Sequence, residues 1–535
     1  MEGSKIKFSL NCFEPTAARY AAAIVSGLLL FASFPLLRWS FLVWAALLPL
    51  LAALLRETKL GRGFLLGYAT GGVFFASSCY WIVGVMERYG GLSGTLSFGI
   101  LLLFAGLFSV FFGAFGLIEV LAARRSRSAG LCLSPFLWVS TEWARTYLFT
   151  GFPWNLLGYA VRPVGLEQLA AITGVYGLSF LAAATSAVVL GPWVFRRRKA
   201  AGIALLVWIL ALLAANRILK PPPLTRGDSI AILVQPNVPL AGSAADQWAP
   251  WIHPQPLDRL VEKSVRAARQ LSPPRPPLLV WPEDSAPFYF DRDPIFHAAL
   301  ETLAERSGAY VIAGTVTFKG GRLSKPQNSA VVLSPEGSLL LRYDKIHLVP
   351  FGEYVPWWAF PGKTGKITSQ VGNFVPGSRV RVAKTPEGTI GVFICYEAIF
   401  PQLVTQFVRA GAQVLVNISD DGWYGNSSAG DEHFWMARFR AIENHRYLLR
   451  DTNDGITAIV DPYGRVVQRI PRRRFGILEG RFRYLTAETF YTKHDDVFTW
   501  LAALITLLGV GWTRIGRRAR TRDDPNLTPE DEAKR

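Results

Sequence analysis

Long apolar segments fill the first 216 residues of the chain and return once near its end. A helix that crosses a bilayer needs about 20 mostly apolar residues, within a range of about 17–25. The pattern predicts eight candidate spans, near 20–37, 40–55, 64–86, 95–122, 129–145, 168–194, 200–216 and 498–513. Lysines and an arginine precede the first span, as in a signal peptide, but six more spans follow it at once. An uncleaved first helix is therefore favoured.

Basic residues are unevenly distributed among the loops between these spans. The loops after spans two, four and six contain ten: Arg56, Lys59, Arg62, Arg124, Arg125, Arg127, Arg196, Arg197, Arg198 and Lys199. The loops after spans one, three and five contain only Arg38, Arg88, Arg145 and Arg162. Lysine and arginine accumulate on the cytoplasmic side of a membrane. The asymmetry predicts a cytoplasmic N-terminus, residues 217–497 outside, and a basic C-terminal tail back inside.

The pattern changes after a proline-rich linker, "LKPPPLTRGD", at 219–228. Short β-branched runs then alternate with helical patterns, which favours an α/β domain with a layered sheet core. The expected strands are 229–235, 277–282, 309–318, 329–334, 339–343, 389–395, 412–418, 455–460 and 465–470. The expected helices are 255–271, 294–307, 401–410 and 431–446.

One long segment, 346–388, has no clear periodicity and is rich in Gly, Pro and aromatic residues. Long irregular loops in compact domains are often lids or binding loops. This segment could insert partly into the lipid interface, or fold back over its own core, since amphipathic aromatic side chains suit both places. Trp357 and Trp358 lie within it and are candidate lid or substrate contacts.

Charge and cysteine content add two constraints. The formal net charge is +18, but much of it lies in the loops that set membrane orientation, which argues against nucleic-acid binding. Of four cysteines, Cys395 is the only one in the external domain, so it has no partner there for a structural disulfide. A buried cysteine is usually a small hydrophobe; a leftover thiol in an oxidising compartment can also be reactive.

Three stretches supply groups that could activate this thiol. "LLVWPEDSAPF" places Glu283 after an apolar strand, "RYDKIHLVPFGEYVP" places Lys345 after another, and "GVFICYEAIFP" ends a third at Cys395. A nucleophilic cysteine needs a base or a nearby positive charge, because a free thiol is only a few per cent thiolate at pH 7. Alone, each charged residue is more often simply a solvated strand end.

Together the three stretches resemble the nitrilase superfamily, whose Glu, Lys and Cys occur in "PE", "YxK" and "ICYE" stretches in this chain order. The resemblance implies an αββα sandwich fold. Predicted membrane spans on both sides of the domain narrow the resemblance to the membrane-embedded apolipoprotein N-acyltransferase family. Further stretches match that family: "VQPN" (234–237), "FTGFPWNLLGY" (149–159), "KIHLVPFGEYVP" (345–356), "DDGWYG" (420–425) and "MARFRAIENHRYLLRDTNDGITAIVDPYGRV" (436–466).

The chain also departs from the family pattern. Asp420 stands where the family usually has Asn, and "DTND" (451–454) is unusually acidic. After "VQPN" the family runs quickly to a Lys-Trp pair, whereas here "VPLAGSAADQWAPW" intervenes. Either Trp248 or Trp251 could therefore hold the aromatic position. These departures concern substrate contacts and leave the three catalytic candidates in place.

Roles follow from general chemistry. Glu283, its pKa raised by burial, is expected to take the thiol proton and return it to the leaving group. Lys345 is expected to favour the thiolate and donate to the oxyanion, with the Tyr396 backbone N–H as a second donor. Glu353 and Glu397 either orient Lys345 and the cysteine loop or are purely structural; Trp423 is a further candidate substrate contact. No metal-ligand spacing or phosphate-binding glycine loop occurs, so no metal, cofactor or nucleotide is expected.

The resulting prediction is a bacterial inner-membrane enzyme with its catalytic domain on the periplasmic side and both termini in the cytoplasm. The family implies transfer of an acyl chain from a phospholipid, through a thioester, to the N-terminal amine of diacylated apolipoproteins. Two alternatives stay open: a membrane-anchored amidase that uses water, and a transporter or non-catalytic receptor. The spans contain few ionisable residues, which argues against transport. The expected divisions are a membrane domain (1–218), linker (219–228), catalytic domain (229–490), last helix (495–514) and charged tail (515–535).

Overall fold

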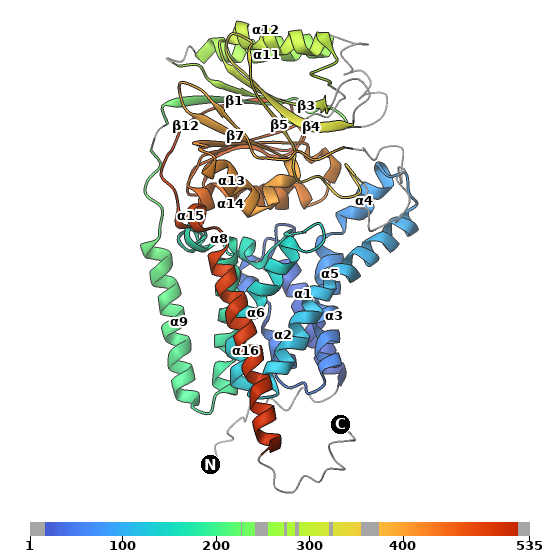
Figure 1. Cartoon of the computed structure of the whole chain (residues 1–535), viewed down its shortest axis with the longest axis vertical. Helices are drawn as coiled ribbons and strands as arrows, with labels where there is room; N and C mark the ends of the chain where they lie inside the picture. The colour runs from blue at the N-terminus through green and yellow to red at the C-terminus, as the bar shows by residue number, and fades with distance from the viewer. Residues whose placement is uncertain are drawn as a thin grey trace, which may run out of the picture.

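The chain forms a helical bundle with a two-sheet α/β part stacked on one end (Figure 1). The computed structural model describes residues 16–225, 227–240, 255–271, 275–283, 288–319, 325–354 and 374–522. Helix α9 (Arg198–Ile218) runs from the far end of the bundle toward the α/β part, and α16 (Val497–Arg522) runs back in the opposite direction, packed mainly against α6 (Arg127–Tyr147) (Figure 1).

The bundle is built from helices that precede and include α9, together with α16. In chain order these are α1 (Thr16–Ala32), η2 (Ser40–Trp44), α2 (Leu48–Leu54), α3 (Leu60–Ser78), α4 (Trp81–Arg88), α5 (Gly94–Ala123), α6 (Arg127–Tyr147), η3 (Leu157–Ala160), α7 (Val164–Glu167), α8 (Ala170–Val194) and α9.

Helices α5, α8 and α9 are the ones in the described part of the chain that are long and apolar enough to cross a membrane. The pair α3 and α4 makes a fourth if it counts as one span, although it is bent by 51°. The predicted span at 40–55 is two short helices, η2 and α2, and α8 is kinked at Gly174, whose φ is 63°. The apolar segments predicted at 40–55 and 64–86 are therefore each divided between two helices, and the count of eight spans stays a prediction.

Twelve strands form two six-stranded sheets in the described part of the chain. The first has the order β12-β1-β2-β3-β4-β5 and the second β11-β10-β9-β8-β7-β6. Their bounds are β1 (Ser229–Gln235), β2 (Leu278–Val280), β3 (Tyr310–Phe318), β4 (Pro326–Leu333), β5 (Leu339–Asp344), β6 (Val382–Lys384), β7 (Thr389–Ile394), β8 (Val414–Ser419), β9 (Leu448–Thr452), β10 (Thr457–Val460), β11 (Val466–Ile470) and β12 (Gly476–Phe482).

Alternate residues along the strands face two different hydrophobic cores, and this identifies the layers. On β1, Ile232 and Val234 pack in one cluster with the helices α11 (Gln255–Leu271) and α12 (Pro294–Ser307). Ala231 and Leu233 face the other way, into a cluster shared with the second sheet. Helices α13 (Pro401–Arg409) and α14 (Ala429–Asn444) cover the second sheet on the bundle side (Figure 1), and the short α15 (Phe490–His494) follows β12. The predicted αββα layering is confirmed.

All nine predicted strands and all four predicted helices of this part are present, with ends shifted by a few residues. Three strands were missed. β6 has only three residues, β12 contains two glycines, and β9 includes a buried Arg450 and Asp451 that break the apolar pattern expected of a central strand. Polar pairs inside a sheet core cannot be recognised from hydropathy alone.

Candidate active site

The carboxyl ends of β2, β5 and β7 carry the three predicted catalytic residues. β2 runs parallel to β3, and β5 also points that way because two antiparallel pairings separate it from β3. Glu283 follows β2, Lys345 follows β5 and Cys395 follows β7. Residues after strands with a common direction gather at one edge of a sheet, which is where open α/β proteins bind ligands. Glu283 and Lys345 share such an edge of the first sheet, and Cys395 follows a strand of the second sheet.

Lys345 lies at the centre of the cluster and is 1% exposed. Its Nζ is 3.2 Å from Glu283 Oε1 and 3.0 Å from Glu353 Oε1. Burial alone would lower its pKa, but the negative charges of Glu283 and Glu353 outweigh burial and raise it. The side chain is therefore a buried cation at neutral pH.

Glu283 uses both carboxylate oxygens. Besides Lys345, its Oε1 accepts a hydrogen bond from Asn328 Nδ2 at 2.8 Å, and its Oε2 accepts from the Asp420 backbone N–H at 2.8 Å. The side chain is 7% exposed. These three donors, from β4, β5 and the end of β8, fix the carboxylate between the two sheets.

Cys395 begins the 3₁₀ helix η4 (Cys395–Ile399) with a φ of 50°, directly after β7. A left-handed conformation in a non-glycine residue is strained, and such strain clusters at functional sites. Burial raises the pKa of the thiol, Glu283 raises it further, and Lys345 lowers it. The thiol is thus protonated at rest, and a thiolate must be generated by transfer of its proton to a base.

The predicted supporting carboxylates have different partners. Glu353 contacts Lys345 through Oε1 and accepts from the Val349 backbone N–H through Oε2 at 2.7 Å. Glu397 does not contact Lys345 and is fully buried. Its Oε1 accepts from the Tyr343 hydroxyl and the Ile346 backbone N–H, both at 2.7 Å. Its Oε2 accepts from the Ile394 N–H at 2.8 Å, so one carboxylate joins the turn after β5 to the turn after β7.

The aromatic candidates are only partly within the described residues. Tyr396 is 5% exposed, and its ring meets that of Phe400 edge-on. Trp423 is 40% exposed and packs against Tyr89, in the connection between α4 and α5. Trp248, Trp251, Trp357 and Trp358 lie outside the described residues.

The Asp420 side chain, the departure from the family pattern, accepts from the Gly422 N–H at 3.0 Å and lies 3.3–3.4 Å from Asn453 Nδ2. Its backbone, rather than its carboxylate, contacts Glu283.

Two polar residues at the site, the partly buried Asn328 and the fully buried His433, were not found from the sequence. Asn328 donates one amide nitrogen to both Glu283 and Glu353, at 2.8 and 2.7 Å. His433, on α14, lies 3.1 Å from the Cys395 carbonyl oxygen. Asn328 is one of three polar residues in a row on β4, and His433 shares no short motif with Cys395, so only the spatial arrangement reveals either.

Comparison with known proteins covers both parts of the chain. Residues 26–188 match the family profile described as apolipoprotein N-acyltransferase N-terminal domain, and residues 235–483 match carbon-nitrogen hydrolase. The apolipoprotein N-acyltransferase of Geobacter metallireducens is 38% identical over 90% of this chain and 92% of its own. That of Allorhizobium ampelinum is 32% identical over 86% of this chain and 87% of its own.

Among solved structures, a nitrilase-superfamily amidase from Nesterenkonia AN1 aligns with 51% of this chain and 96% of its own, with a TM-score of 0.37 and 17% identity. The relatives that are alike in sequence extend over the bundle and the two sheets together. The chain belongs to the apolipoprotein N-acyltransferase family and is an acyltransferase.

Proposed function

We propose that this protein moves an acyl chain from a membrane phospholipid to Cys395, and then to the N-terminal α-amine of an S-diacylglyceryl-cysteine in an apolipoprotein. The relatives' names support lipoprotein N-acylation. The observation that carries the chemistry is the buried ammonium of Lys345, within 3.2 Å of one carboxylate and 3.0 Å of another, beside a strained cysteine turn.

In the first half-reaction, Glu283 accepts the thiol proton as the sulfur attacks an ester carbonyl of the phospholipid. Lys345 Nζ and the Tyr396 N–H donate to the oxyanion that forms. The C–O bond to the glycerol then breaks, and Glu283 returns its proton to that oxygen. The products are a thioester on Cys395 and a lysophospholipid, and no nucleotide is consumed because a thioester lies close to an ester in energy.

In the second half-reaction, the α-amine of the lipoprotein attacks the thioester carbonyl. Glu283 takes the amine proton, the C–S bond breaks, and the thiolate recovers the proton as the amide is released. Covalent catalysis of this kind divides one difficult transfer into two easier steps and gives ping-pong kinetics.

The proposed compartment is the periplasmic side of the bacterial inner membrane, with both termini in the cytoplasm. The uneven distribution of basic loop residues supports this orientation. It is consistent with a bundle in which α9 ends and α16 begins at the end that faces the α/β part (Figure 1). With this orientation the domain divisions of the sequence analysis stand as proposals, and so does a lid role for the segment 346–388.

A product assay tests the transfer. Purified enzyme in mixed micelles receives a phospholipid with an isotope-labelled acyl chain and a diacylglyceryl lipopeptide with a free N-terminus. We expect the label in an amide on the lipopeptide, and parallel lines in double-reciprocal plots as both substrates vary. Release of the label as free fatty acid, at the same rate with and without the lipopeptide, would mean that water is the acceptor and the proposal is wrong.

A further inference from the structure

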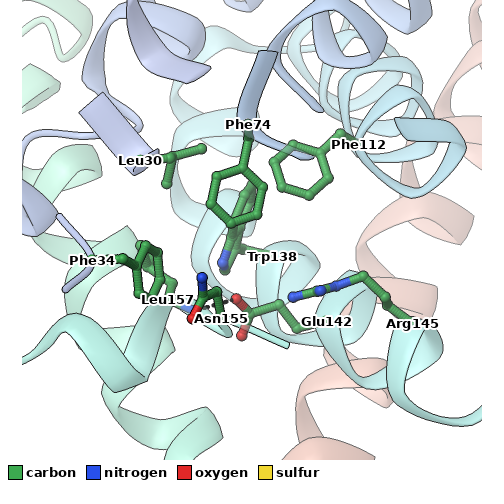
Figure 2. A pocket seen from close by; sticks show the side chains of 9 residues that line it. All are labelled: Leu30, Phe34, Phe74, Phe112, Trp138, Glu142, Arg145, Asn155 and Leu157. Atoms are coloured by element: carbon green, nitrogen blue, oxygen red, sulfur yellow. Dashed lines mark hydrogen bonds between the residues drawn. The ribbon is translucent and has the colours of Figure 1, made fainter. Parts of the chain in front are cut away.

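The proposed chemistry leaves one conspicuous stretch without a role: "FPWN", residues 152–155, in the loop between α6 and η3. The bundle holds this loop firmly. Arg145 Nη1 donates to the carbonyl oxygens of Phe152 and Trp154 at 2.9 and 2.8 Å, and Glu142 Oε1 accepts from the Leu157 N–H at 2.7 Å. Figure 2 shows Glu142 and Arg145 together on α6, with Asn155 and Leu157 lining the same small pocket.

The other side of the loop contacts α14. Trp154 Nε1 and Asn155 Nδ2 both donate to Glu432 Oε2, at 2.6 and 3.0 Å. The Ser428 hydroxyl donates to Oε1 at 2.8 Å. Glu432 is 1% exposed, so a carboxylate with donors on both oxygens joins the bundle to the first turn of α14.

The next residue of α14 reaches the nucleophile. His433 is fully buried, and its ring stacks on the Trp154 indole, with centroids 6.0 Å apart and planes at 23°. A carbonyl oxygen only accepts hydrogen bonds, so His433 Nε2 carries a proton and donates it to the Cys395 carbonyl at 3.1 Å. The nearest partner of Nδ1 is Asp421 Oδ1 at 2.9 Å, with Arg450 Nη2 at 3.2 Å from the same nitrogen. Burial and Arg450 lower the pKa of His433, against the opposing effect of the Asp421 carboxylate.

We propose that the FPWN loop positions the nucleophile: Trp154 and Asn155 fix Glu432, and the adjacent His433 holds the Cys395 carbonyl in its left-handed turn. Glu432 and His433 are then positioning residues for acyl capture, and the catalytic sheets depend on the bundle for active-site geometry as well as for anchoring. The inference rests on the proposed chemistry at Cys395.

The energetic reason is that a strained turn persists only where its surroundings over-determine it. Cys395 has the β7 ladder on one side and the His433 hydrogen bond on the other. Displacement of a reacting group by about 1 Å can cost about 10²-fold in rate. A shift of the first turn of α14 is therefore expected to slow thioester formation even when the protein remains folded.

The test compares full-length variants in detergent. Glu432→Gln places an amide nitrogen among donors, and His433→Phe keeps the ring but removes the N–H. Tyr159→Phe is the matched control, because it also removes one buried hydrogen bond between the bundle side and α14, the one that Arg440 Nη2 donates to the Tyr159 hydroxyl at 2.9 Å. Trp154→Phe removes one of the hydrogen bonds to Glu432 and serves in place of Glu432→Gln if that variant does not fold. His433→Gln retains an N–H and tests whether a side-chain donor at this position restores the rate.

Three quantities are measured: the single-turnover rate of thioester formation, the KM for phospholipid, and the alkylation rate of Cys395 by iodoacetamide, followed on its own peptide by mass spectrometry. We expect Glu432→Gln, Trp154→Phe and His433→Phe to slow thioester formation at least ~10-fold at little changed KM, the scale of one lost buried hydrogen bond to a charged group. Tyr159→Phe should stay within about twofold and His433→Gln should recover part of the rate.

Thioester formation at the wild-type rate in Trp154→Phe and His433→Phe would overturn the inference. So would equal losses in Tyr159→Phe and the other variants, because the effect would then be general destabilisation. If the wild-type protein forms no thioester, the proposed function fails instead, and the alkylation rates still decide whether the loop positions the thiol.

Discussion

Replacement of Lys345 by Met tests the centre of the site, because it removes the charge and leaves the side-chain volume nearly unchanged. Two carboxylates approach Nζ, at 3.2 and 3.0 Å, and at an effective dielectric constant of about 20 each contact is worth roughly 5 kcal/mol of attraction. The substitution also removes the free-energy cost of burying the Lys345 cation, which offsets much of the lost attraction. The net loss of stability when a buried ion pair is broken is typically about 3–5 kcal/mol.

Proton uptake limits the damage to stability. One of the two unpaired carboxyl groups can bind a proton, which costs about 4 kcal/mol at pH 7 and less at lower pH. We therefore expect Lys345→Met to lose about 3–4 kcal/mol of stability at pH 7 and to approach the wild-type melting temperature near pH 5. The pH dependence separates loss of the cation from a simple packing defect.

The effect on catalysis should be larger than the effect on folding. Loss of one oxyanion donor costs about 10²–10³ in rate, and the thiol also loses the positive charge that lowers its pKa. We expect single-turnover thioester formation to fall at least ~10²-fold in protein that is folded by melting and gel filtration. Lys384→Met, at an exposed position on β6, is the control. A folded Lys345→Met protein that retains more than about a tenth of the rate would refute the assigned role.

Three further predictions concern the pH dependence of stability, the transfer rate and the membrane orientation. Burial raises the pKa of Glu432 and Glu443 to about 7. Between about pH 4.5 and pH 7 the folded state therefore holds protons that the unfolded state has released, and this proton binding stabilises the fold. The stabilisation is complete below about pH 4.5 and is lost as the pH rises through 7. Glu443→Gln should weaken the resulting fall in melting temperature between about pH 5 and pH 8, and an unchanged slope would contradict the assignment. Asp420→Asn should change the transfer rate by less than about tenfold, since the contact with the catalytic base is made by its backbone; a larger loss in steady-state turnover would show that the carboxylate itself acts. A periplasm-active reporter fused after Gly242 should be active and one fused after Arg198 inactive, and the reverse pattern would place the catalytic part in the cytoplasm.

The layers of the α/β part could be predicted because its strands are short, apolar and separated by helices or tight turns. Residues 229–235 form a fully or mostly buried run, as expected of a strand that is covered on both faces. The breaks within the helices of the bundle could not be predicted in the same way. Helical breaks at Gly174 and between Ser78 and Trp81 depend on tertiary contacts, and an apolar run gives no sign of them.

The three catalytic candidates could be identified because each follows a strand in a recognisable short stretch. Asn328 and His433 could not, because their importance lies in contacts between segments far apart in the sequence: β4 with the turn after β2, and α14 with the turn after β7. The FPWN loop was noticed as a family stretch, but its contact with Glu432 spans 278 positions along the chain. Pairings of this kind require coordinates.

The most direct test of the central claim is the covalent state of Cys395. Enzyme incubated with phospholipid alone should gain the mass of one acyl chain on the Cys395 peptide, and neutral hydroxylamine should remove it, as expected of a thioester. A diacylglyceryl lipopeptide with a free α-amine should discharge this acyl group into an amide, while the same lipopeptide with its amine blocked should leave it in place. Turnover without an acylated Cys395, or equal discharge by both lipopeptides, would contradict the account.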